Sequence, residues 1–271
     1  MYSGTTLTTA SGRVMGAHQK IDRIARKHLR RLGVTRPAFP SSRDILKFEG
    51  KNGPDGIKRK SPAVNEPWHY FNPFDDDDNT LIDLIEQHYK LLVIALRDSE
   101  KERASFEAAW LAHALVDGLT PAHHYPYEEK LTELRGGESI ETRTSIKEKL
   151  VMPGDTKREQ VKNNWKMWGP KGLMTTHGLF ELGIAAIIAP LSFGESVPSD
   201  QDITRMKEQG IGEYFKLRAR EIAVLDMYQR FYKKGWTAKL SLDVRQRLIP
   251  EIIKTVSLAW YCALEESKKK K

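Results

Sequence analysis

Residues 108–117 read Ala-Ala-Trp-Leu-Ala-His-Ala-Leu-Val-Asp, an apolar stretch that only two ionisable residues, His113 and Asp117, interrupt. Such a composition predicts a buried helix, which we expect to extend from Ser99 to Gly118 and to end at the turn Gly118-Leu-Thr-Pro121. The four-residue spacing places both ionisable side chains on one face of that helix. Because a buried carboxylate is costly unless it is paired or bound to a metal, the two residues require partners inside the fold.

Helical periodicity continues along most of the chain, and no alternating strand pattern accompanies it. Apolar residues at three- and four-residue steps predict further helices at residues 17–32, 81–96, 172–188, 203–234 and 240–266. The segment 172–188 is the most apolar of these, so we expect it to be central. Four aspartates, Asp75 to Asp78, precede the helix at 81–96, a position that favours helix capping over a calcium site. The predicted fold class is therefore all-α.

The chain has 271 residues, which is enough for one large domain with a sizeable core. We expect a single helical domain over residues 13–267, preceded by a flexible segment at 1–12 and followed by a disordered lysine tail at 268–271. Two long connections, at 33–73 and 128–170, contain the glycine and proline residues that are typical of loops, and we expect them to be loops.

Composition excludes several classes of protein. The longest apolar stretch, at 182–193, is far shorter than the roughly 20 residues that a bilayer span requires. The first 16 residues lack both the basic and the apolar regions of a secretory signal, so we expect a cytoplasmic protein. A single cysteine, Cys262, excludes an internal disulfide and any cysteine-based zinc site.

The net charge of +8 does not by itself indicate a nucleic-acid ligand. Residues 1–74 hold 14 Lys and Arg against 5 Asp and Glu, whereas residues 75–135 hold 6 against 14. The basic and acidic segments can therefore pack together, and four of the remaining positive charges belong to the terminal lysine run. The eight histidines and 36 carboxylates are the more informative groups.

Histidine followed four residues later by Asp or Glu occurs four times, whereas composition alone predicts roughly one such pair. On a helix this spacing lets both side chains share a metal ion or form a hydrogen bond that joins two helices, and the sequence leaves both interpretations open. Pro126 disfavours a regular helix between His124 and Glu128. The remaining pairs are His18/Asp22, His113/Asp117 and His177/Glu181.

The wider order of these residues resembles the zinc-dependent phospholipase C and zinc single-strand nuclease superfamily. The segment Leu111-Ala-His-Ala-Leu-Val-Asp-Gly-Leu-Thr-Pro-Ala-His123 is similar to the central motif of that family. The segment Glu66-Pro-Trp-His69-Tyr-Phe-Asn-Pro is similar to its second histidine segment. The resemblance runs from about residue 13 to residue 190, and it implies a helical bundle of the zinc phospholipase C type.

The resemblance implies two zinc ions, and a third whose ligand set is incomplete. The first ion would be held by Asp55, His69, His113 and Asp117. The second would be held by His123, His177 and Glu181. The third would lie between Asp117 and His18. Histidine and carboxylate ligands without thiolate also suit catalytic zinc, which keeps open positions for water.

Asp55 has a second implied role, as the base that orients or deprotonates the attacking water. Its setting, Asn52-Gly-Pro-Asp-Gly56, is also typical of an ordinary surface turn. The spacing to His69 matches the family and supports the functional interpretation.

The chain departs from the family pattern at three places. Family members are usually exported, and a mature N-terminal tryptophan supplies ligands to the third zinc, whereas here no tryptophan precedes Trp68. His123 and His177 are further apart than in typical members, which implies an insertion at 128–170. Glu181 matches the phospholipase branch more closely than the nuclease branch, in which aspartate is common.

The implied activity is phosphoester hydrolysis, in which zinc-bound hydroxide attacks phosphorus. A phospholipase C acting on phospholipid is the first interpretation, and a single-strand nuclease or nucleotidase on the same zinc fold is the alternative. A non-catalytic basic helical protein, binding nucleic acid or an anionic membrane by charge, is the second alternative. No protein partner is inferred.

Aromatic residues near the site could contact either phospholipid or single-stranded nucleic acid. A phospholipid requires an apolar or aromatic rim around the site, and single-stranded nucleic acid requires stacking aromatics beside a basic groove, for which Lys58-Arg-Lys60 is a candidate. The candidate substrate-binding residues are Trp68, Tyr70 and Phe71, with Phe74, Trp165 and Trp168 as further members of an aromatic rim.

Overall fold

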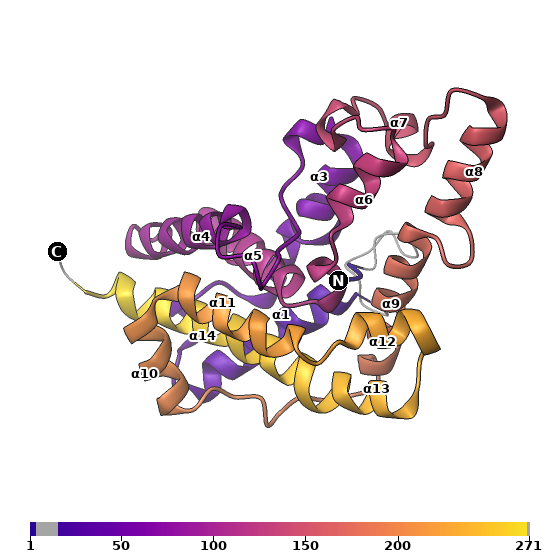
Figure 1. Ribbon diagram of the computed structural model, residues 1–271. Helices are drawn as coiled ribbons and strands as arrows, with labels where there is room; N and C mark the ends of the chain where they lie inside the picture. Colours follow the sequence, from indigo (N-terminus) through magenta and orange to yellow (C-terminus); the bar gives the residue numbers. More distant parts are fainter. Residues whose placement is uncertain (4–15, 270–271) are drawn as a thin grey trace.

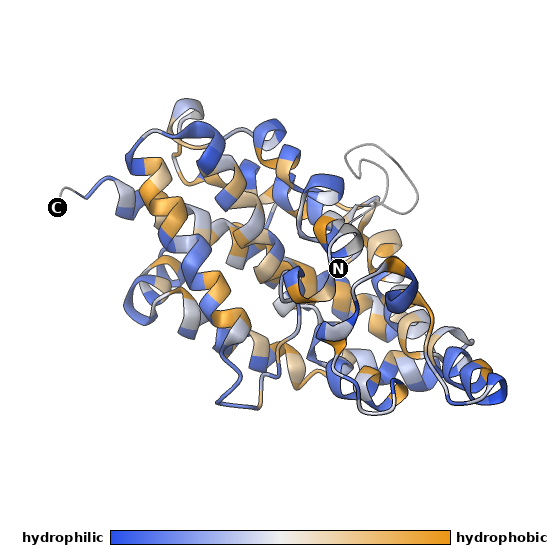
Figure 2. Cartoon of the chain, turned by 90° about the horizontal axis from the view of Figure 1, so that it is seen from above, coloured by the Kyte–Doolittle hydropathy of each residue, from blue (hydrophilic) through white to orange (hydrophobic). Residues whose placement is uncertain are grey.

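The computed structural model describes residues 1–3 and 16–269, apart from the side chains of Arg36, Arg59 and Lys60. Every regular element within these residues is helical (Figure 1), which confirms the predicted all-α class. Hydrophobic and hydrophilic residues alternate along the helices (Figure 2), as amphipathic helices that share one core require. No helix in the described part of the chain is both long enough and apolar enough to cross a membrane.

Two helices form the centre of the molecule. In α5 (Lys101–Gly118), 13 of 18 residues are buried, and α14 (Ile249–Ser267) buries its side chains against α5 and its neighbours. The indole Nε1 of Trp260 on α14 donates a hydrogen bond to the carbonyl of Ala108 on α5 at 3.0 Å. This contact joins the two helices at a point where the surrounding side chains exclude water. The helix predicted at 99–118 is therefore the central one.

The other large helices pack around this pair. The helix α4 (Thr80–Arg97) forms a hairpin with α5, and α1 (Ala17–Arg31) lies along α14. Burial in α1 follows a four-residue repeat, because Ile21, Ala25 and Leu29 are all inaccessible to solvent. The remaining layer consists of α9 (Leu173–Ile188), α10 (Asp200–Gln209), α11 (Ile211–Ala223), α12 (Met227–Lys234) and α13 (Ala238–Asp243).

Two predictions about helices were wrong. The segment 203–234 is not one helix, because Gly210 and Asp226 adopt positive φ values of 80° and 51° and separate α10, α11 and α12. The apolar helix α9 is not central, since only six of its 16 residues are buried and it lies at the edge of the bundle. The segment 240–266 comprises α13, a π-helical turn, η7 (Val244–Leu248), and α14.

The aspartate run at 75–78 does not cap a helix, contrary to the prediction. The residue that precedes α4 is Asn79, and its side chain makes no capping hydrogen bond. Asp76 instead forms ion pairs with Lys216 and Arg220 on α11, which fix this loop to the C-terminal half of the chain. The acidic stretch is thus neutralised partly by α11 rather than by the basic first 74 residues alone.

The two connections predicted as loops are largely helical. Residues 33–73 contain η1 (Arg36–Ala38), α2 (Ser42–Ile45), η2 (Leu46–Phe48), η3 (Gly50–Asn52), α3 (Pro54–Lys60) and η4 (Ala63–Asn65). Short helices meet the backbone hydrogen-bonding requirement locally, which the periodicity of so few residues does not reveal.

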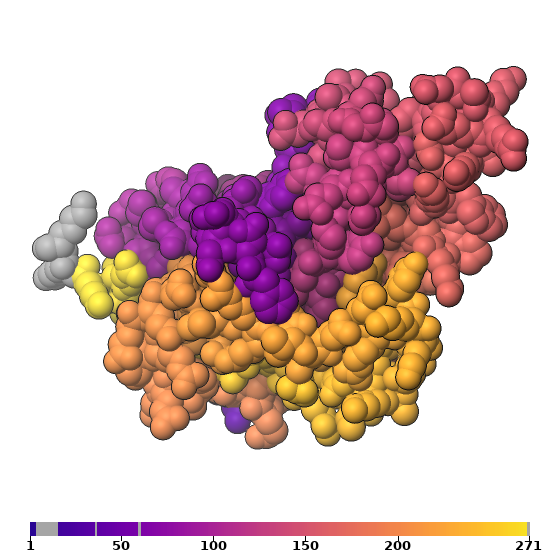
Figure 3. Space-filling view, in the orientation of Figure 1, coloured from indigo at the N-terminus to yellow at the C-terminus, as the bar shows by residue number. Residues whose placement is uncertain are grey.

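Residues 127–168 form a small projecting subdomain, which corrects the prediction of an insertion loop. It comprises α6 (Tyr127–Leu134), η6 (Ile140–Thr142), α7 (Ile146–Leu150) and α8 (Lys157–Trp168). Figures 1 and 3 show it standing away from the main bundle beside α3 and α9. It has its own apolar cluster, which contains Tyr127, Leu131, Leu134, Ile140, Met152 and Met167.

The ends of the chain differ from the prediction where they are described. Met1 and Ser3 are buried, so the expected flexible segment at 1–12 is wrong for these residues, and residues 4–15 lie outside the described part of the chain. At the other end, Lys268 pairs with Glu265 at 2.6 Å, whereas residues 270–271 of the expected disordered tail are outside the description.

The helix crossing at Gly118 provides a test of the core. A β-carbon at Gly118 would lie 2.5 Å from the ring of Phe215 and 2.6 Å from Leu81, both of which are fully buried. We therefore expect Gly118→Ala to lower the free energy of unfolding by about 1–3 kcal/mol in urea denaturation, because neither neighbour can move freely. The matched control is Gly178→Ala in α9, where a β-carbon meets no atom within 4 Å. That change should be neutral or stabilise by about 0.5–1 kcal/mol, and an equal loss in both variants would contradict the packing argument.

Candidate metal centre

Six segments of the chain bring the predicted ligands together beside α5. The helix α5 supplies His113 and Asp117, and the turn η5 (Pro121–His124) that follows it supplies His123. Helices α1, α3 and α9 and the extended segment before α4 supply the others, which are His18, Asp55, His177 with Glu181, and His69. All eight residues converge on one place, although they span 164 positions of sequence (181 − 18 + 1).

Their ligand atoms fall into three groups, within each of which every pair lies within 4.8 Å. The first group contains Asp55, His69, His113 and Asp117. The second contains His123, His177 and Glu181. The third contains His18, Glu49 and His113. The first two groups have the same members as the two ligand sets expected from the sequence, and the burial of each is suited to holding a cation.

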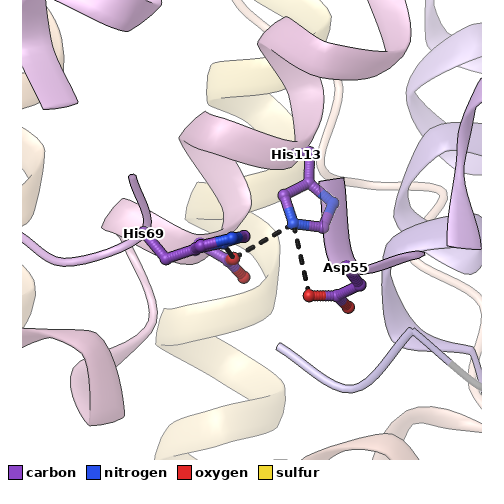
Figure 4. Close-up of side chains that lie close together, drawn as sticks. Asp55, His69 and His113 are labelled. Atoms are coloured by element: carbon purple, nitrogen blue, oxygen red, sulfur yellow. Dashed lines mark hydrogen bonds and ion pairs between the residues drawn. The ribbon is translucent and has the colours of Figure 1, made fainter. Parts of the chain in front are cut away.

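The first group is arranged around the carboxylate of Asp117. His69 Nδ1 lies 2.7 Å from Asp117 Oδ2, and His113 Nε2 lies 3.2 Å from the same oxygen. Figure 4 shows His69, His113 and Asp55 close together, with Asp55 Oδ1 at 3.8 Å from His113 Nε2. The side chain of Asp55 is 27% exposed, whereas those of the other three are nearly inaccessible. The group therefore opens to solvent on the side of Asp55.

The second group contains an unfavourable contact that a cation would relieve. His123 Nδ1 lies 2.7 Å from the carbonyl oxygen of His69, so this nitrogen donates the hydrogen bond. Burial lowers the pKa of His123, which leaves the ring neutral and its Nε2 with a lone pair. That lone pair faces Glu181 Oε1 at 2.9 Å. Two acceptors at this distance repel unless a positive charge lies between them. In metal sites, a histidine commonly donates one ring N–H to a carbonyl and offers the lone pair of its other nitrogen to the metal, as His123 could do here.

The positive charge nearest to this contact is the amine of Met1. It donates a hydrogen bond to Asp117 and lies 3.1 Å from Glu181 Oε1 and 3.5 Å from His123 Nε2. Burial alone would lower the pKa of this amine, but the charges of Asp117 and Glu181 outweigh burial and raise it to about 10. The ammonium is therefore charged at neutral pH and marks a position at which the surrounding groups stabilise a cation.

The carboxylates of Asp117 and Glu181 also have the pKa shifts expected of groups that lie beside a cation. Burial would raise the pKa of Asp117, but the charges of the Met1 amine and of the protonated His113 outweigh burial and hold this pKa well below its usual range. The pKa of Glu181 is likewise well below its usual range, because the amine and His177 outweigh burial. Both groups are therefore ionised and available as ligands at neutral pH.

His69 and His113 differ in protonation. Burial, together with the charge of Lys58, lowers the pKa of His69 to about 3, so its ring is neutral. Its Nδ1 faces Asp117, and its buried Nε2 has no hydrogen-bond partner among the described residues. For His113, burial is outweighed by the carboxylates of Glu49 and Asp117, which raise its pKa well above the usual value. A metal ion at Nε2 would displace that proton.

His18 lies against the first group from the other side. Its ring stacks on that of His113 with centroids 4.2 Å apart and an angle of 9° between the planes. His18 Nε2 lies 3.1 Å from Asp117 Oδ1, the oxygen that also accepts from the Met1 amine. These contacts place His18 beside Asp117, whereas Glu49 and His113 complete the ligand-atom group that contains His18.

Two functional candidates were missed by the sequence analysis. Glu49 accepts a hydrogen bond from His113 Nδ1 at 3.0 Å and so fixes the orientation of that ring. No helical spacing connects Glu49 with the other ligands, and no signal in the sequence identifies it. Met1 was missed because the fold, not a local pattern, brings it to the site. Asp22, which was identified only as the partner of His18 by spacing, has its pKa raised well above the usual value by burial and by Glu49.

The candidate substrate residues divide into two sets. Tyr70 lies at the site, with its ring stacked 5.0 Å from Tyr127 and 5.4 Å from His123, and Trp68 contacts Tyr70 edge-on. Phe71 was predicted to bind substrate, and this is wrong, because it is 1% exposed and packs in the core against Phe215. Side-chain alternation along the extended segment explains the difference, since Tyr70 and Phe71 point to opposite sides.

The other three histidines are not part of the centre. His88 Nδ1 lies 2.7 Å from Glu107 in a buried pair between α4 and α5. His124 Nε2 donates to the carbonyl of Gly118 at 2.7 Å, and burial lowers its pKa to about 4. His28 is buried in α1. None of these three histidines belongs to a ligand-atom group.

No family model, curated protein or solved structure matches this chain. The resemblance to the zinc phospholipase C and nuclease superfamily therefore stays a prediction. The structure itself supports the coarser conclusion that buried His, Asp and Glu clusters could hold metal ions.

Glu49 provides a test of the centre that leaves every expected ligand in place. We expect Glu49→Gln to weaken zinc binding about 10- to 100-fold, because the orientation and basicity of His113 depend on the carboxylate behind it. Zinc affinity is measured by titration of metal-free protein against a chromophoric chelator. Glu102→Gln, an exposed change on α5, is the matched control and should bind zinc as the unaltered protein does. Equal affinities for all three proteins would mean that Glu49 does not support the site.

Proposed function

We propose that this protein is a zinc-dependent phosphodiester hydrolase, and that phospholipid is its first candidate substrate. The observation that carries the proposal is the convergence of His, Asp and Glu side chains into two groups, within each of which the ligand atoms lie within 4.8 Å of one another. A single hydrogen-bonded staple between helices needs one histidine and one carboxylate, whereas these two groups gather seven side chains. The histidine and carboxylate chemistry of the donors favours zinc over calcium or magnesium, which prefer oxygen ligands.

The two ligand groups share Asp117 as a neighbour, because its Oδ1 also lies 3.7 Å from His123 Nε2. Zinc, when bound, lowers the pKa of coordinated water towards about 7 and stabilises charge that develops on phosphoryl oxygens. His69, His113 and Asp117 would hold one ion with Asp55, and the second group would hold another. Two ions held in this way would together attract and neutralise the phosphate of a phosphodiester substrate.

Asp55 is the residue that we assign as the base. It is the most exposed member of the first group, so it is the one that water and substrate reach first. Burial would raise the pKa of Asp55, but the neighbouring His113, His69 and His18 outweigh burial and lower this pKa. The carboxylate is therefore ionised at neutral pH. An ionised carboxylate at this position accepts a hydrogen bond from the attacking water and orients it.

Lys58 and the aromatic side chains provide the entrance to the site. The ammonium of Lys58 lies 5.3 Å from the centre of the Tyr70 ring, and this residue is half-buried beside the first group. A positive charge here would attract a phosphodiester, and the tyrosine and Trp68 would contact its apolar or aromatic substituent. The expected basic groove at Lys58-Arg-Lys60 is described only at Lys58.

A second candidate function, single-strand nuclease or nucleotidase, is favoured by a cavity at the N-terminal end of α9. Tyrosine and lysine residues that could stack on bases and neutralise phosphates line it, namely Tyr125, Tyr228, Tyr232, Lys130, Lys166 and Lys171. Thr176 also lines this cavity and precedes the ligand His177 in α9. The non-catalytic alternative, a basic helical binding protein, assigns no role to the buried ligand clusters.

Zinc content and phosphodiesterase activity test the proposal together. We expect the purified protein to hold about two zinc ions per chain. The variant His113→Ala/Asp117→Ala should lose zinc from the first group, and its activity on bis(p-nitrophenyl) phosphate should fall at least about 10³-fold. The control is His28→Gln, a histidine change outside the centre, which should retain zinc and activity. Less than one equivalent of zinc, with full activity in the double variant, would exclude a metallohydrolase.

Substrate preference separates the two enzymatic candidates. We expect zinc-dependent release of phosphocholine from phosphatidylcholine vesicles, with hydrolysis of single-stranded DNA at least about 10-fold slower under the same conditions, because specificity is a ratio of kcat/KM values. Chelator-treated protein is the blank for both assays. Hydrolysis of DNA without hydrolysis of lipid would establish the nuclease instead.

A further inference from the structure

The projecting subdomain exposes an unusual number of large apolar side chains. Of the 13 such side chains that are exposed in the described part of the chain, six lie within residues 146–168. They are Ile146, Leu150, Val151, Val161, Trp165 and Trp168, and we call them the α7–α8 apolar surface. The fractional exposures of Val161 and Trp165 are 69% and 68%. Scattered apolar residues need no explanation, whereas a contiguous set indicates an interaction surface.

Four of these side chains, Val151, Val161, Trp165 and Trp168, line one groove. In α8, Val161, Trp165 and Trp168 follow the three- and four-residue steps that place side chains on a single face of a helix. The indole Nε1 of Trp168 donates a hydrogen bond to the carbonyl of Leu150 at 2.7 Å, which joins α7 to α8. Val151 lines the same groove as the two tryptophans. The α7–α8 apolar surface is therefore continuous from one helix to the other.

Hydrogen bonds fix the helix α8 in place, and its exposed apolar face is separate from the face that packs in the core of the subdomain. Asn164 accepts a hydrogen bond from the amide of Met152 at 3.1 Å and donates one to its carbonyl at 2.9 Å, which fixes α8 against the segment after α7. Met152 and Met167 face inward and are buried in the cluster of the subdomain. The helix α8 thus already has an inner apolar face, and Val161 and Trp165 lie on a second one.

Basic residues surround the apolar surface. Residues 146–171 contain seven Lys and Arg against three Asp and Glu, a net charge of +4. On α8, Arg158 lies three residues before Val161, and Lys162 three before Trp165, so both flank the apolar stripe. Both side chains are exposed. A surface that enters the headgroup region of an anionic membrane typically combines tryptophan and aliphatic side chains with flanking lysine or arginine.

We infer that the α7–α8 apolar surface docks the protein on anionic phospholipid membranes. The apolar side chains enter the boundary between headgroups and acyl chains, and the flanking cations pair with headgroup phosphates. Four of the six side chains are aliphatic and offer no face on which a base could stack, which favours lipid over single-stranded nucleic acid as the ligand. The inference does not depend on hydrolysis, because no residue of the metal centre belongs to this surface.

The position of the surface also connects it with the candidate site. The helix α8 leads through Pro170 into α9, which carries His177 and Glu181. Figures 1 and 3 show α8 at the outer end of the projecting subdomain, away from the main bundle. The helix that follows α8 in the chain is thus the one that carries the second ligand group's His177 and Glu181.

Partitioning of the full-length protein onto sonicated vesicles tests the inference. We expect co-sedimentation with phosphatidylcholine vesicles containing 30% phosphatidylglycerol to exceed that with pure phosphatidylcholine by at least about 10-fold, and to weaken as salt is raised. Val161→Ser/Trp165→Ser should reduce the partition coefficient at least about 10-fold, and Arg158→Glu/Lys162→Glu should remove the preference for anionic lipid. All these positions are exposed, so circular dichroism should show unchanged folding.

Matched controls distinguish this surface from general stickiness. Val224→Ser alters an equally exposed valine just after α11, and Lys239→Glu alters an exposed lysine in α13, so both changes lie outside the α7–α8 apolar surface. Both should leave partitioning within about twofold of the unaltered protein. Partitioning should also persist in EDTA, so a failure of zinc chemistry leaves this result unchanged. Absence of binding to anionic vesicles, or equal binding by the Val161→Ser/Trp165→Ser variant, would overturn the inference. Binding of single-stranded oligonucleotide but not of vesicles, lost in the same variant, would assign the surface to nucleic acid instead.

Discussion

The carboxylate of Asp117 is the group on which the rest of the candidate site depends. It is buried, ionised and surrounded by nitrogen atoms, with His18, His69 and His113 within 3.2 Å and the Met1 amine as a further donor. An ionised carboxylate in such a place is stable only if the compensation is nearly complete. His113 lies one helical turn from Asp117 on α5, whereas His18, His69 and Met1 come from other parts of the chain. The charge of Asp117 therefore constrains the packing of several elements.

This constraint accounts for the position of α5. A helix that carries Asp117 and His113 on one face and alanine, leucine and valine on the others can be buried from all sides only at the centre of a bundle. Its small residues let α4 and α14 approach closely, and Gly118 permits contact with Leu81 and Phe215 at the end that carries the site. The apolar packing of the bundle thus holds the polar cluster in place.

The sequence predicted this part of the molecule well because several signals agreed there. The apolar composition of 108–117, the four-residue histidine and carboxylate spacing, and the turn after Gly118 all indicated one buried helix with ligands on one face. The ligand groups could be anticipated only through the resemblance, since no local pattern shows that Asp55 or His69 meets His113. Glu49 carried no pattern at all, and its role depends on tertiary placement.

Predictions failed where a single signal was used alone. High apolar content made α9 a candidate for the centre, yet the helix lies at the edge and exposes Leu179, because composition does not say which faces are covered. Glycine and proline content suggested loops at 33–73 and 128–170, yet short helices with well-formed caps occur there, such as the capping box of Ser145 and Glu148. The aspartate run had the charge of a cap, but Asp76 found stronger partners on α11.

The same electrostatic requirement links folding to the occupancy of the centre. His123 Nε2 and Glu181 face one another as acceptors, and the only described cation between them and Asp117 is the Met1 amine. One ammonium has three hydrogen atoms to donate, whereas the two ligand groups present seven side chains. A metal ion that took up several of these lone pairs would stabilise the folded chain by mass action, because the unfolded chain does not assemble the ligands. The buried polar cluster is therefore tolerable in the core to the extent that positive charge compensates it, and its His, Asp and Glu groups could hold a metal ion.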